Sequence, residues 1–212
     1  MVPRPVYLRY YTSMLQHRFI DSALRNPDKI AFIDRSLGSN VSYSRALLAS
    51  LILARRFKKL ERGRIGVMLP TSSAGGLAVI AALMADRTPV MINYSTGAEK
   101  NCLYAQEQCD FRVIVTAKAL LEKIGCKKLP NMVLIEDILG TLGKLEKALA
   151  FVKSNLPISL LKRAVGKSNP DSPAVILFTS GSEKEPKVVQ LTQRNILSNI
   201  DSFSEMMDIY EM

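Results

Sequence analysis

A run of hydroxyl residues around a glycine, closed by a lysine, is the part of this sequence best suited to chemistry. It follows an apolar stretch at residues 174–178 and reads Thr-Ser-Gly-Ser-Glu-Lys-Glu-Pro-Lys over residues 179–187. Each hydroxyl can donate a hydrogen bond to a phosphate oxygen, and Gly181 lets backbone N–H groups approach an anion closely. Lys187 adds a mobile positive charge. The pattern predicts a grip for the phosphates of a nucleotide, with the hydroxyls also near a Mg²⁺ ion carried by ATP.

Two other interpretations of this loop have to be weighed. Gly181 and Lys187 have the spacing of a Walker A loop, but Pro186 replaces its second glycine and Val188 replaces its Ser/Thr. A strand, not a helix, is expected to follow, so we reject the Walker A interpretation. A polar hairpin between two strands, with no ligand, stays open as the simple alternative.

Strand-like and helix-like patterns alternate along the rest of the chain and form the frame that carries this loop. Such alternation predicts an α/β fold with mostly parallel strands flanked by helices. Ser44, Ser72 and Thr192 are the expected N-caps of three of the helices. The predicted strands lie at residues 29–34, 64–69, 88–92, 111–116, 131–135, 174–178 and 188–191, and the predicted helices at 12–25, 44–59, 73–85, 97–108 and 192–207.

Residues 144–165 interrupt this rhythm with a basic amphipathic stretch. Apolar residues recur at helical spacing, with Lys144, Lys147 and Lys153 on other faces; the apolar set is Leu142, Leu145, Leu149, Val152 and Leu156. A helix packed on the domain with a solvated lysine face is one interpretation. Contact with an anionic membrane or an acidic carrier protein is the other. A polar linker at 168–173 then predicts a subdomain at residues 1–170 and the start of a second at 171–212.

Composition narrows the class of protein. Of 212 residues, 48% are hydrophobic and 23% charged, as in a folded globular protein. The longest weakly polar run, residues 74–85, is too short to span a membrane, and the N-terminus lacks the apolar region of a signal peptide. We therefore expect a cytoplasmic protein, peripheral to the inner membrane or tethered to it only through other parts.

Charge and metal-ligating residues exclude several functions. The net charge of +10 is compatible with nucleic acid, an anionic membrane or an acidic protein as partner. Basic residues are spread along the chain without interleaved aromatics, so nucleic acid is not expected. One histidine, His17, leaves no metal-ligand cluster and no Ser-His-Asp triad. The three cysteines, Cys102, Cys109 and Cys126, are expected to be free thiols, the first two buried.

The loop resembles the signature of the adenylate-forming superfamily, which includes acyl-CoA synthetases, luciferases and nonribosomal peptide adenylation domains. That family has Ser/Thr-Ser-Gly-Ser/Thr-x-Gly-x-Pro-Lys-Gly, then Val-x-Leu-Thr-His and a helix. The matching residues here are Thr179, Ser180, Gly181, Ser182, Pro186, Lys187, Val189, Leu191 and Thr192. Lys184, Val188 and Gln193 depart from the pattern: the first two replace glycines, which is expected to stiffen the loop, and the third replaces a histidine.

The resemblance extends upstream over residues 26–31, 41–43, 65–70 and 91–97. In these segments and the loop, the sequence looks most like acyl–acyl carrier protein synthetases of the 2-acylglycerophosphoethanolamine acyltransferase type. Those synthetases are often fused to a lysophospholipid acyltransferase. The resemblance implies ATP and Mg²⁺ as cofactors and a fatty acid as substrate. The acceptor thiol would be acyl carrier protein or, as the alternative, coenzyme A in a long-chain fatty acid ligase.

The same resemblance assigns nucleotide binding to residues of the loop. The expected set is Thr179, Ser180, Gly181, Ser182, Glu183, Lys184, Pro186 and Lys187. The family's Tyr-Gly-x-Thr-Glu segment, ribose-binding aspartate and catalytic lysine do not appear in the 212 residues, so no catalytic residue is assigned. This chain alone is expected to carry out little or no adenylation. A non-catalytic module that binds a carrier protein or a membrane is the remaining alternative, favoured by Lys184 and Val188.

Overall fold

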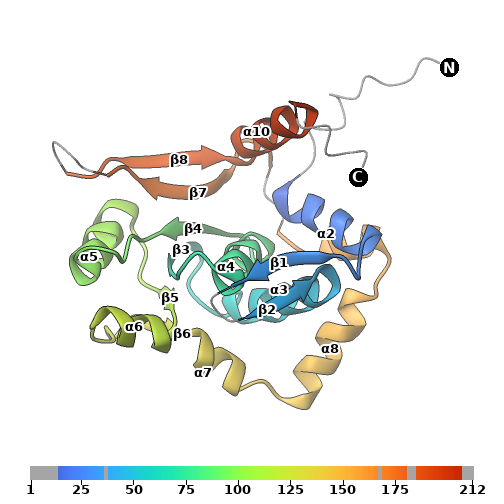
Figure 1. The fold of residues 1–212 in the computed structure, drawn as a ribbon, viewed down its shortest axis with the longest axis horizontal. Coiled ribbons are helices and arrows are strands. Elements are labelled where there is room, and N and C mark those ends of the chain that lie inside the picture. The colour runs from blue at the N-terminus through green and yellow to red at the C-terminus, as the bar shows by residue number, and fades with distance from the viewer. Residues whose placement is uncertain (1–13, 36–37, 167–168, 181–184, 207–212) are drawn as a thin grey trace.

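The computed structural model of the chain describes residues 14–35, 38–166, 169–180 and 185–206 (Figure 1). Its centre is a six-stranded sheet in the order β6-β5-β3-β4-β7-β8. The first five strands in this order are parallel, and β8 is antiparallel to β7. The strands are β3 (Gly63–Met68), β4 (Arg87–Met91), β5 (Ile114–Thr116), β6 (Met132–Leu134), β7 (Pro173–Phe178) and β8 (Val188–Thr192). The predicted α/β fold with a mostly parallel sheet is confirmed.

A separate antiparallel hairpin precedes this sheet and is tied to it through a helix. It consists of β1 (Ile30–Asp34) and β2 (Ser39–Ser42). The buried Asp34 carboxylate accepts hydrogen bonds from the backbone N–H and the hydroxyl of Ser73, at 2.9 and 2.8 Å. Ser73 is the first residue of helix α4 (Ser73–Met84), so the carboxylate also lies at the positive end of that helix.

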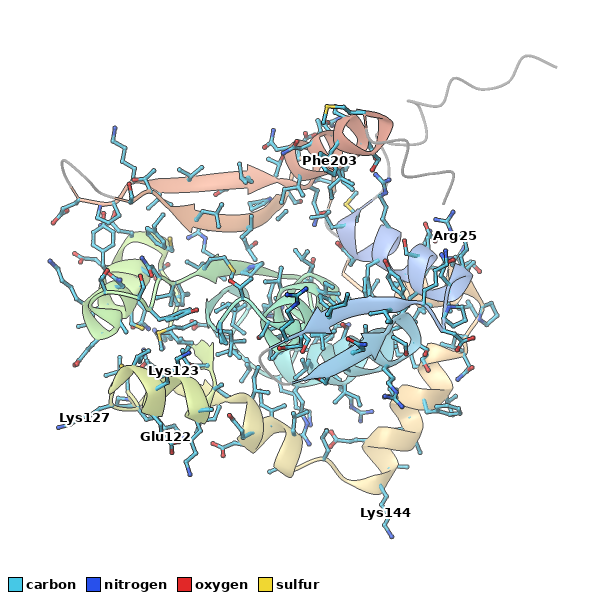
Figure 2. The ribbon with its side chains drawn as sticks, in the orientation of Figure 1. Arg25, Glu122, Lys123, Lys127, Lys144 and Phe203 are labelled. Carbon is cyan, nitrogen blue, oxygen red and sulfur yellow. The ribbon has the colours of Figure 1, made fainter. Side chains whose placement is uncertain are left out.

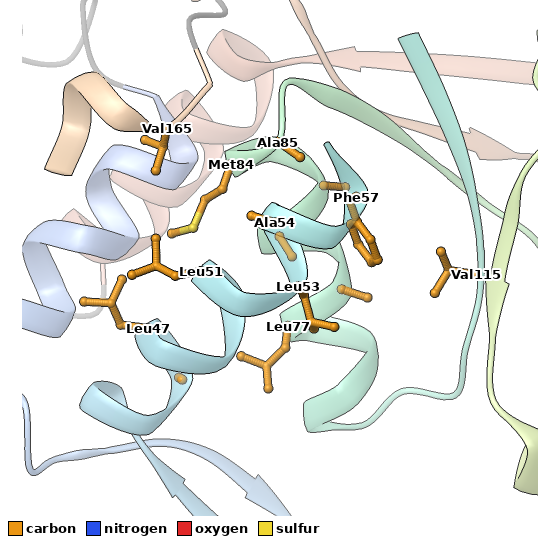
Figure 3. Packing of buried hydrophobic residues seen from close by; sticks show 14 of the residues in the cluster. Leu47, Leu51, Leu53, Ala54, Phe57, Leu77, Met84, Ala85, Val115 and Val165 are labelled. Atoms are coloured by element: carbon orange, nitrogen blue, oxygen red, sulfur yellow. The ribbon is translucent and has the colours of Figure 1, made fainter. Parts of the chain in front are cut away.

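Helices cover both faces of the central sheet because its strands are apolar on both sides. Along β3, Ile65 and Val67 belong to one buried cluster and Met68 to the other. The first cluster includes residues of α2 (Leu15–Arg25), α3 (Tyr43–Phe57), α4 and α9 (Ile158–Ala164); Figure 3 shows part of it between α3 and α4. The second includes residues of α5 (Ala98–Cys109) and α6 (Lys118–Ile124). The side-chain period of two along β3 thus divides the core into two layers.

The first turn of helix α4 lies very close to the turn that follows β3. A Cβ atom on Gly75 would lie 2.4 Å from the backbone oxygen of Pro70, so no larger residue fits there. The side chain of Ser72 accepts the Gly75 N–H at 3.3 Å, which confirms the predicted N-cap. The glycine therefore lets the turn after β3 fold directly onto the start of the helix.

The predicted cap of α3 is wrong by two residues. Ser42, not Ser44, is the N-cap, and its hydroxyl accepts the N–H of Arg45 at 3.5 Å. The N–H groups of Tyr43 and Ser44 donate instead to the carbonyls of Lys29 and Pro27, both at 2.9 Å. The helix can start early because the preceding loop supplies these acceptors, which the local sequence does not reveal.

Three further helices complete the part of the chain that the structure describes. They are α7 (Ile135–Gly140), α8 (Lys144–Ser154) and α10 (Gln193–Met206). Thr192 and Asn195 cap α10 reciprocally: the Thr192 hydroxyl accepts the Asn195 N–H at 3.1 Å, and the Asn195 side chain accepts the Thr192 N–H at 2.9 Å. The predicted Thr192 cap is confirmed. The division of the chain near residue 170 stays a prediction; β7 pairs with β4 across it at Ile176 and Val90.

His17 gives the folded chain a pH dependence of its own. It is half-buried on α2, and burial lowers the pKa of its imidazole below the ordinary value of 6.5. The positive charge of Lys162 lowers this pKa further, whereas a hydrogen bond with the Lys162 backbone and the negative charge of Asp21 oppose the shift. The unfolded chain therefore binds a proton more readily than the folded chain. Stability from this group is complete above pH 6.5 and is lost as the pH falls below it.

We expect the free energy of unfolding to fall as the pH drops below 6.5, by no more than about 1.4 kcal/mol per pH unit, the limit for one proton. His17→Gln should remove that part of the pH dependence, because glutamine does not titrate. Urea unfolding of both proteins at several pH values measures the difference. Identical pH profiles for the two proteins would contradict the assignment.

Candidate functional site

The hydroxyl-rich loop begins at the carboxyl edge of the parallel strands. Strands β4 and β7 run side by side in the same direction and end at Met91 and Phe178. The loop at 179–187 and the turn at 92–97 therefore leave the sheet at the same edge. In open α/β sheets this edge is where ligands bind.

Two hydrogen bonds between Thr179 and Lys187 close the base of the loop. The Thr179 N–H donates to the Lys187 carbonyl at 3.0 Å, and the Lys187 N–H donates to the Thr179 hydroxyl at 2.9 Å. A hydroxyl that accepts one hydrogen bond can also donate one, so Thr179 closes the loop without giving up its donor. The first and last residues of the predicted grip are thus fixed next to each other.

Tyr104 on α5 anchors the loop from the side, a role that sequence reasoning missed. Its hydroxyl donates to the Pro186 carbonyl at 2.6 Å, and its ring lies 5.9 Å from that of Phe178. A tyrosine has no periodicity that points to a partner 82 residues away in the chain. Together with the Thr179–Lys187 pair, this contact holds both ends of the loop against the second core cluster.

The predicted binding residues are exposed where the structure describes them. Thr179, Ser180 and Lys187 face solvent, and Pro186 is half-buried. No ion pair involves the Lys187 ammonium group among the described residues. The other members of the predicted set, Gly181, Ser182, Glu183 and Lys184, lie outside the described residues. The described part of the loop therefore presents two hydroxyls and one ammonium group to solvent.

The neighbouring turn after β4 is ordered by its own side chains. The Asn93 side chain accepts the N–H and the hydroxyl of Ser95 at 2.9 and 2.7 Å, and the Asn101 amide donates to the carbonyls of Asn93 and Thr96. Tyr94 packs against the second core cluster. The turn therefore forms a preorganised wall beside the start of the loop.

In the described part of the chain, the other reactive residues form neither a metal-binding cluster nor an activated thiol. No group of three or more His, Cys, Asp or Glu side chains that could hold a metal ion occurs in the described part of the chain. Cys102 and Cys109 are buried, as predicted, and burial raises the pKa of the Cys102 thiol to about 12. A thiol with so high a pKa is a poor nucleophile at neutral pH.

A model of the AMP-binding enzyme family matches residues 19–211 of the chain. The chain belongs to this family. The match covers both the parallel sheet and the loop that leaves its carboxyl edge, so the predicted superfamily is confirmed.

Relatives and solved structures agree with this membership. The chain is 26% identical over 211 residues to delta-poly-L-ornithine synthetase of Acinetobacter baumannii, a match that covers 96% of the chain and 14% of that protein. The nonribosomal peptide synthetase FmoA3 is similar in structure, with a TM-score of 0.72 and 16% identity over 93% of the chain and 19% of that protein. O-succinylbenzoate coenzyme A synthetase of Bacillus subtilis has a TM-score of 0.66 and 15% identity, over 92% of this chain and 38% of its own. The chain thus spans less than half of each of these proteins.

Val188 departs from the family pattern of the loop and lies in the described part of the chain, where it fits the structure without backbone strain. Val188, in place of a glycine, lies in β8 opposite Phe178, where a β-branched residue is favoured. The non-glycine residues with positive φ in the described part of the chain are Asp86 and Asp110, both far from the loop in sequence. The backbone at Val188 therefore has an ordinary strand conformation that does not require glycine. The expected stiffening of the loop stays a prediction.

Gln193, which replaces the family's usual histidine, has a structural role. Its side chain is buried; its oxygen accepts the N–H of Leu15 at 2.9 Å, and its amide donates to the side chain of Gln16 at 3.3 Å. It therefore caps the first turn of α2 from the start of α10, 178 residues along the chain. The amide joins the two ends of the described chain.

Proposed function

We propose that the chain is the ATP-binding part of an acid–thiol ligase that forms an acyl-AMP. We propose further that the acid is a fatty acid and that the acceptor is the phosphopantetheine thiol of an acyl carrier protein. The single observation that supports ATP binding best is the pair of hydrogen bonds between Thr179 and Lys187, which fixes the exposed ends of the loop at the carboxyl edge of the sheet. The ends of this loop are held in place before any ligand arrives.

The reaction has two steps. A carboxylate oxygen attacks the α-phosphorus of ATP; the bond from that phosphorus to the bridging oxygen breaks and pyrophosphate leaves. The thiol sulfur then attacks the acyl carbon, the bond to the AMP oxygen breaks, and the thiol proton passes to solvent. The hydroxyls of Thr179 and Ser180 and the ammonium of Lys187 would orient the leaving pyrophosphate and stabilise its growing negative charge.

Magnesium fits this loop as a companion of the nucleotide. Mg²⁺ prefers oxygen ligands, keeps several waters and usually binds through substrate phosphates instead of an all-protein cage. The exposed Thr179 and Ser180 hydroxyls are oxygens of this kind. The ion would neutralise charge on the phosphates of ATP.

Related proteins define the rivals to this proposal. They are named for poly-L-ornithine synthesis, nonribosomal peptide synthesis and succinylbenzoate–coenzyme A ligation, so an amino acid or an aromatic acid is the competing substrate class and coenzyme A the competing acceptor. One of these structures is an AMPPNP complex of FmoA3, which supports ATP as the nucleotide. The fatty acid rests on the loop sequence and its upstream resemblance.

Titration calorimetry of the 212-residue chain tests nucleotide binding. We expect Mg-ATP to bind more tightly than AMP by at least about tenfold, because only ATP reaches the loop with its β and γ phosphates. Equal affinity for the two nucleotides would remove the loop from the site. Binding of acyl carrier protein without any binding of Mg-ATP would support the non-catalytic module instead.

Pyrophosphate exchange separates the substrate classes. The complete enzyme should incorporate labelled pyrophosphate into ATP when a fatty acid is present, and not when ornithine or an aromatic acid is present instead. The chain alone should show no exchange with any of these acids. Exchange with an amino acid as sole substrate would replace the fatty acid in the proposal and leave ATP binding intact.

A further inference from the structure

Helix α8 packs on the domain through its charged face and leaves its apolar face outside. Ala150, 8% exposed, lies against the body of the protein, and Glu146 forms ion pairs with Arg55, Arg56 and Lys59 of the α3 region. Leu145 is 72% exposed, Val152 62% and Leu149 43%. The helix packs on α3, as one of the two interpretations of this stretch expects, but Leu145 and Leu149 face solvent instead of the domain. We call Leu145, Leu149 and Val152 the α8 stripe.

A small cavity lies beside this stripe, between α3, α4 and α8. Its volume is about 150 Å³. Apolar side chains, including Leu51, Met84 and Leu149, form most of its lining, and Leu149 is shared with the stripe. The remaining lining residues are three cations, Arg55, Lys58 and Lys153, which we call the cation cluster.

The positive charges of the cation cluster converge. The ammonium groups of Lys58 and Lys153 both donate to the carbonyl oxygen of Ala164, at 3.2 and 3.5 Å. Burial, then Lys58 and Arg55, lower the pKa of Lys153. Glu146, which pairs with Arg55, is also shared with Arg56 and Lys59, and no carboxylate pairs with Lys58 or Lys153 among the described residues. Lys144 extends into solvent from the start of the same helix (Figure 2).

Like charges held together repel each other unless an anion joins them. The anion that suits this place must bring hydrocarbon with it, because the cations border an apolar cavity and an exposed apolar stripe. An anionic phospholipid carries both parts: its phosphate can reach the cations while apolar side chains enter the boundary between headgroups and acyl chains. An acidic protein surface would offer the charge but would leave the stripe against polar atoms.

We propose that the α8 stripe and the cation cluster form a docking surface for an anionic lipid membrane. The helix lies in the plane of the interface, with its leucines pointing into the lipid and the cations against the phosphates. None of the helices that the structure describes is long and apolar enough to cross a bilayer, and this surface does not require one. The described ends of the loop at 179–187 lie on the opposite side of the molecule from α8 (Figure 1).

Vesicle sedimentation of the 212-residue chain tests the proposal. The chain should bind vesicles that contain phosphatidylserine and phosphatidylcholine at least about tenfold more tightly than vesicles of phosphatidylcholine alone. High salt should remove this difference, because it screens the charges. Leu145→Ser combined with Val152→Ser should lower binding to the anionic vesicles by at least about tenfold. Lys58→Gln should lower it by roughly fivefold.

Matched controls lie on the far side of the sheet. Leu103→Ser on α5 and Lys123→Gln on α6 alter an exposed leucine and an exposed lysine, and both should leave binding unchanged (Figure 2 labels Lys123). Circular dichroism and the thermal midpoint should be the same for all variants, since each altered apolar side chain is exposed. Equal binding to both kinds of vesicle, or equal losses in the α8 and control variants, would overturn the proposal. The proposal would also be overturned if the chain did not bind vesicles but bound acyl carrier protein in a way that the α8 variants weaken.

Discussion

Replacing Lys187 by alanine in the complete enzyme is expected to slow adenylation by roughly 10²–10³-fold, the usual effect of removing one electrostatic donor from a transition state. The lysine is exposed, and its backbone, not its side chain, closes the loop with Thr179. Loss of the ammonium group should therefore remove charge stabilisation from the departing pyrophosphate without changing the loop. Pyrophosphate exchange at saturating ATP measures the effect.

Two variants control this experiment. Lys100→Ala removes an exposed lysine of α5 and should leave the rate unchanged. Lys187→Arg keeps the charge but changes its shape, so it should recover part of the rate. The thermal midpoints of all variants should agree with that of the parent. Unchanged turnover of Lys187→Ala at saturating ATP would exclude the role proposed for this residue.

Phe57→Ala is expected to cost about 3–5 kcal/mol of folding free energy. Phe57 is the last residue of α3, is 0% exposed, and belongs to the cluster that joins α3 and α4 to β3 (Figure 3). Removing its ring takes away buried apolar surface and leaves a space that backbone elements on several sides cannot collapse to fill. Because the total stability of a domain is about 5–15 kcal/mol, this single change should make the fold marginal.

Urea unfolding measures the loss, and Phe151→Ala is its matched control. Phe151 lies on α8 and is 62% exposed, so its truncation should change stability by no more than about 0.5 kcal/mol. Similar losses for the two phenylalanines would mean that burial in this cluster does not stabilise the fold as argued.

Alternation of strand and helix patterns was enough to predict the architecture. Each long element lies within a few residues of its expected place, because periods of two and 3.6 are properties of the local chain. The Ser72 and Thr192 caps were predictable for the same reason: each bonds a backbone N–H three residues along. The loop between β7 and β8, and the rejection of a Walker A site, also follow from local sequence, since a strand follows Lys187.

Short helices and long-range contacts were not predictable in this way. Helices α6 and α7 have only seven and six residues, too few to display a clear helical period. Tyr104 and Gln193 bond groups 82 and 178 residues away, and no local pattern encodes such partners. The early start of α3 at Tyr43 depends on acceptors in the loop before β1 for the same reason.

Helix α8 shows most clearly where local pattern and tertiary structure differ. Residues 144–154 are predictable as an amphipathic helix from local pattern, because Leu145, Leu149 and Val152 recur at helical spacing. Which face is buried depends on contacts with α3: the arginines at the end of α3 bind Glu146, so the side of α8 that carries Glu146 faces the domain. Periodicity indicates that a helix has one apolar and one polar face. The neighbouring element, here α3, determines which of the two faces packs against the domain.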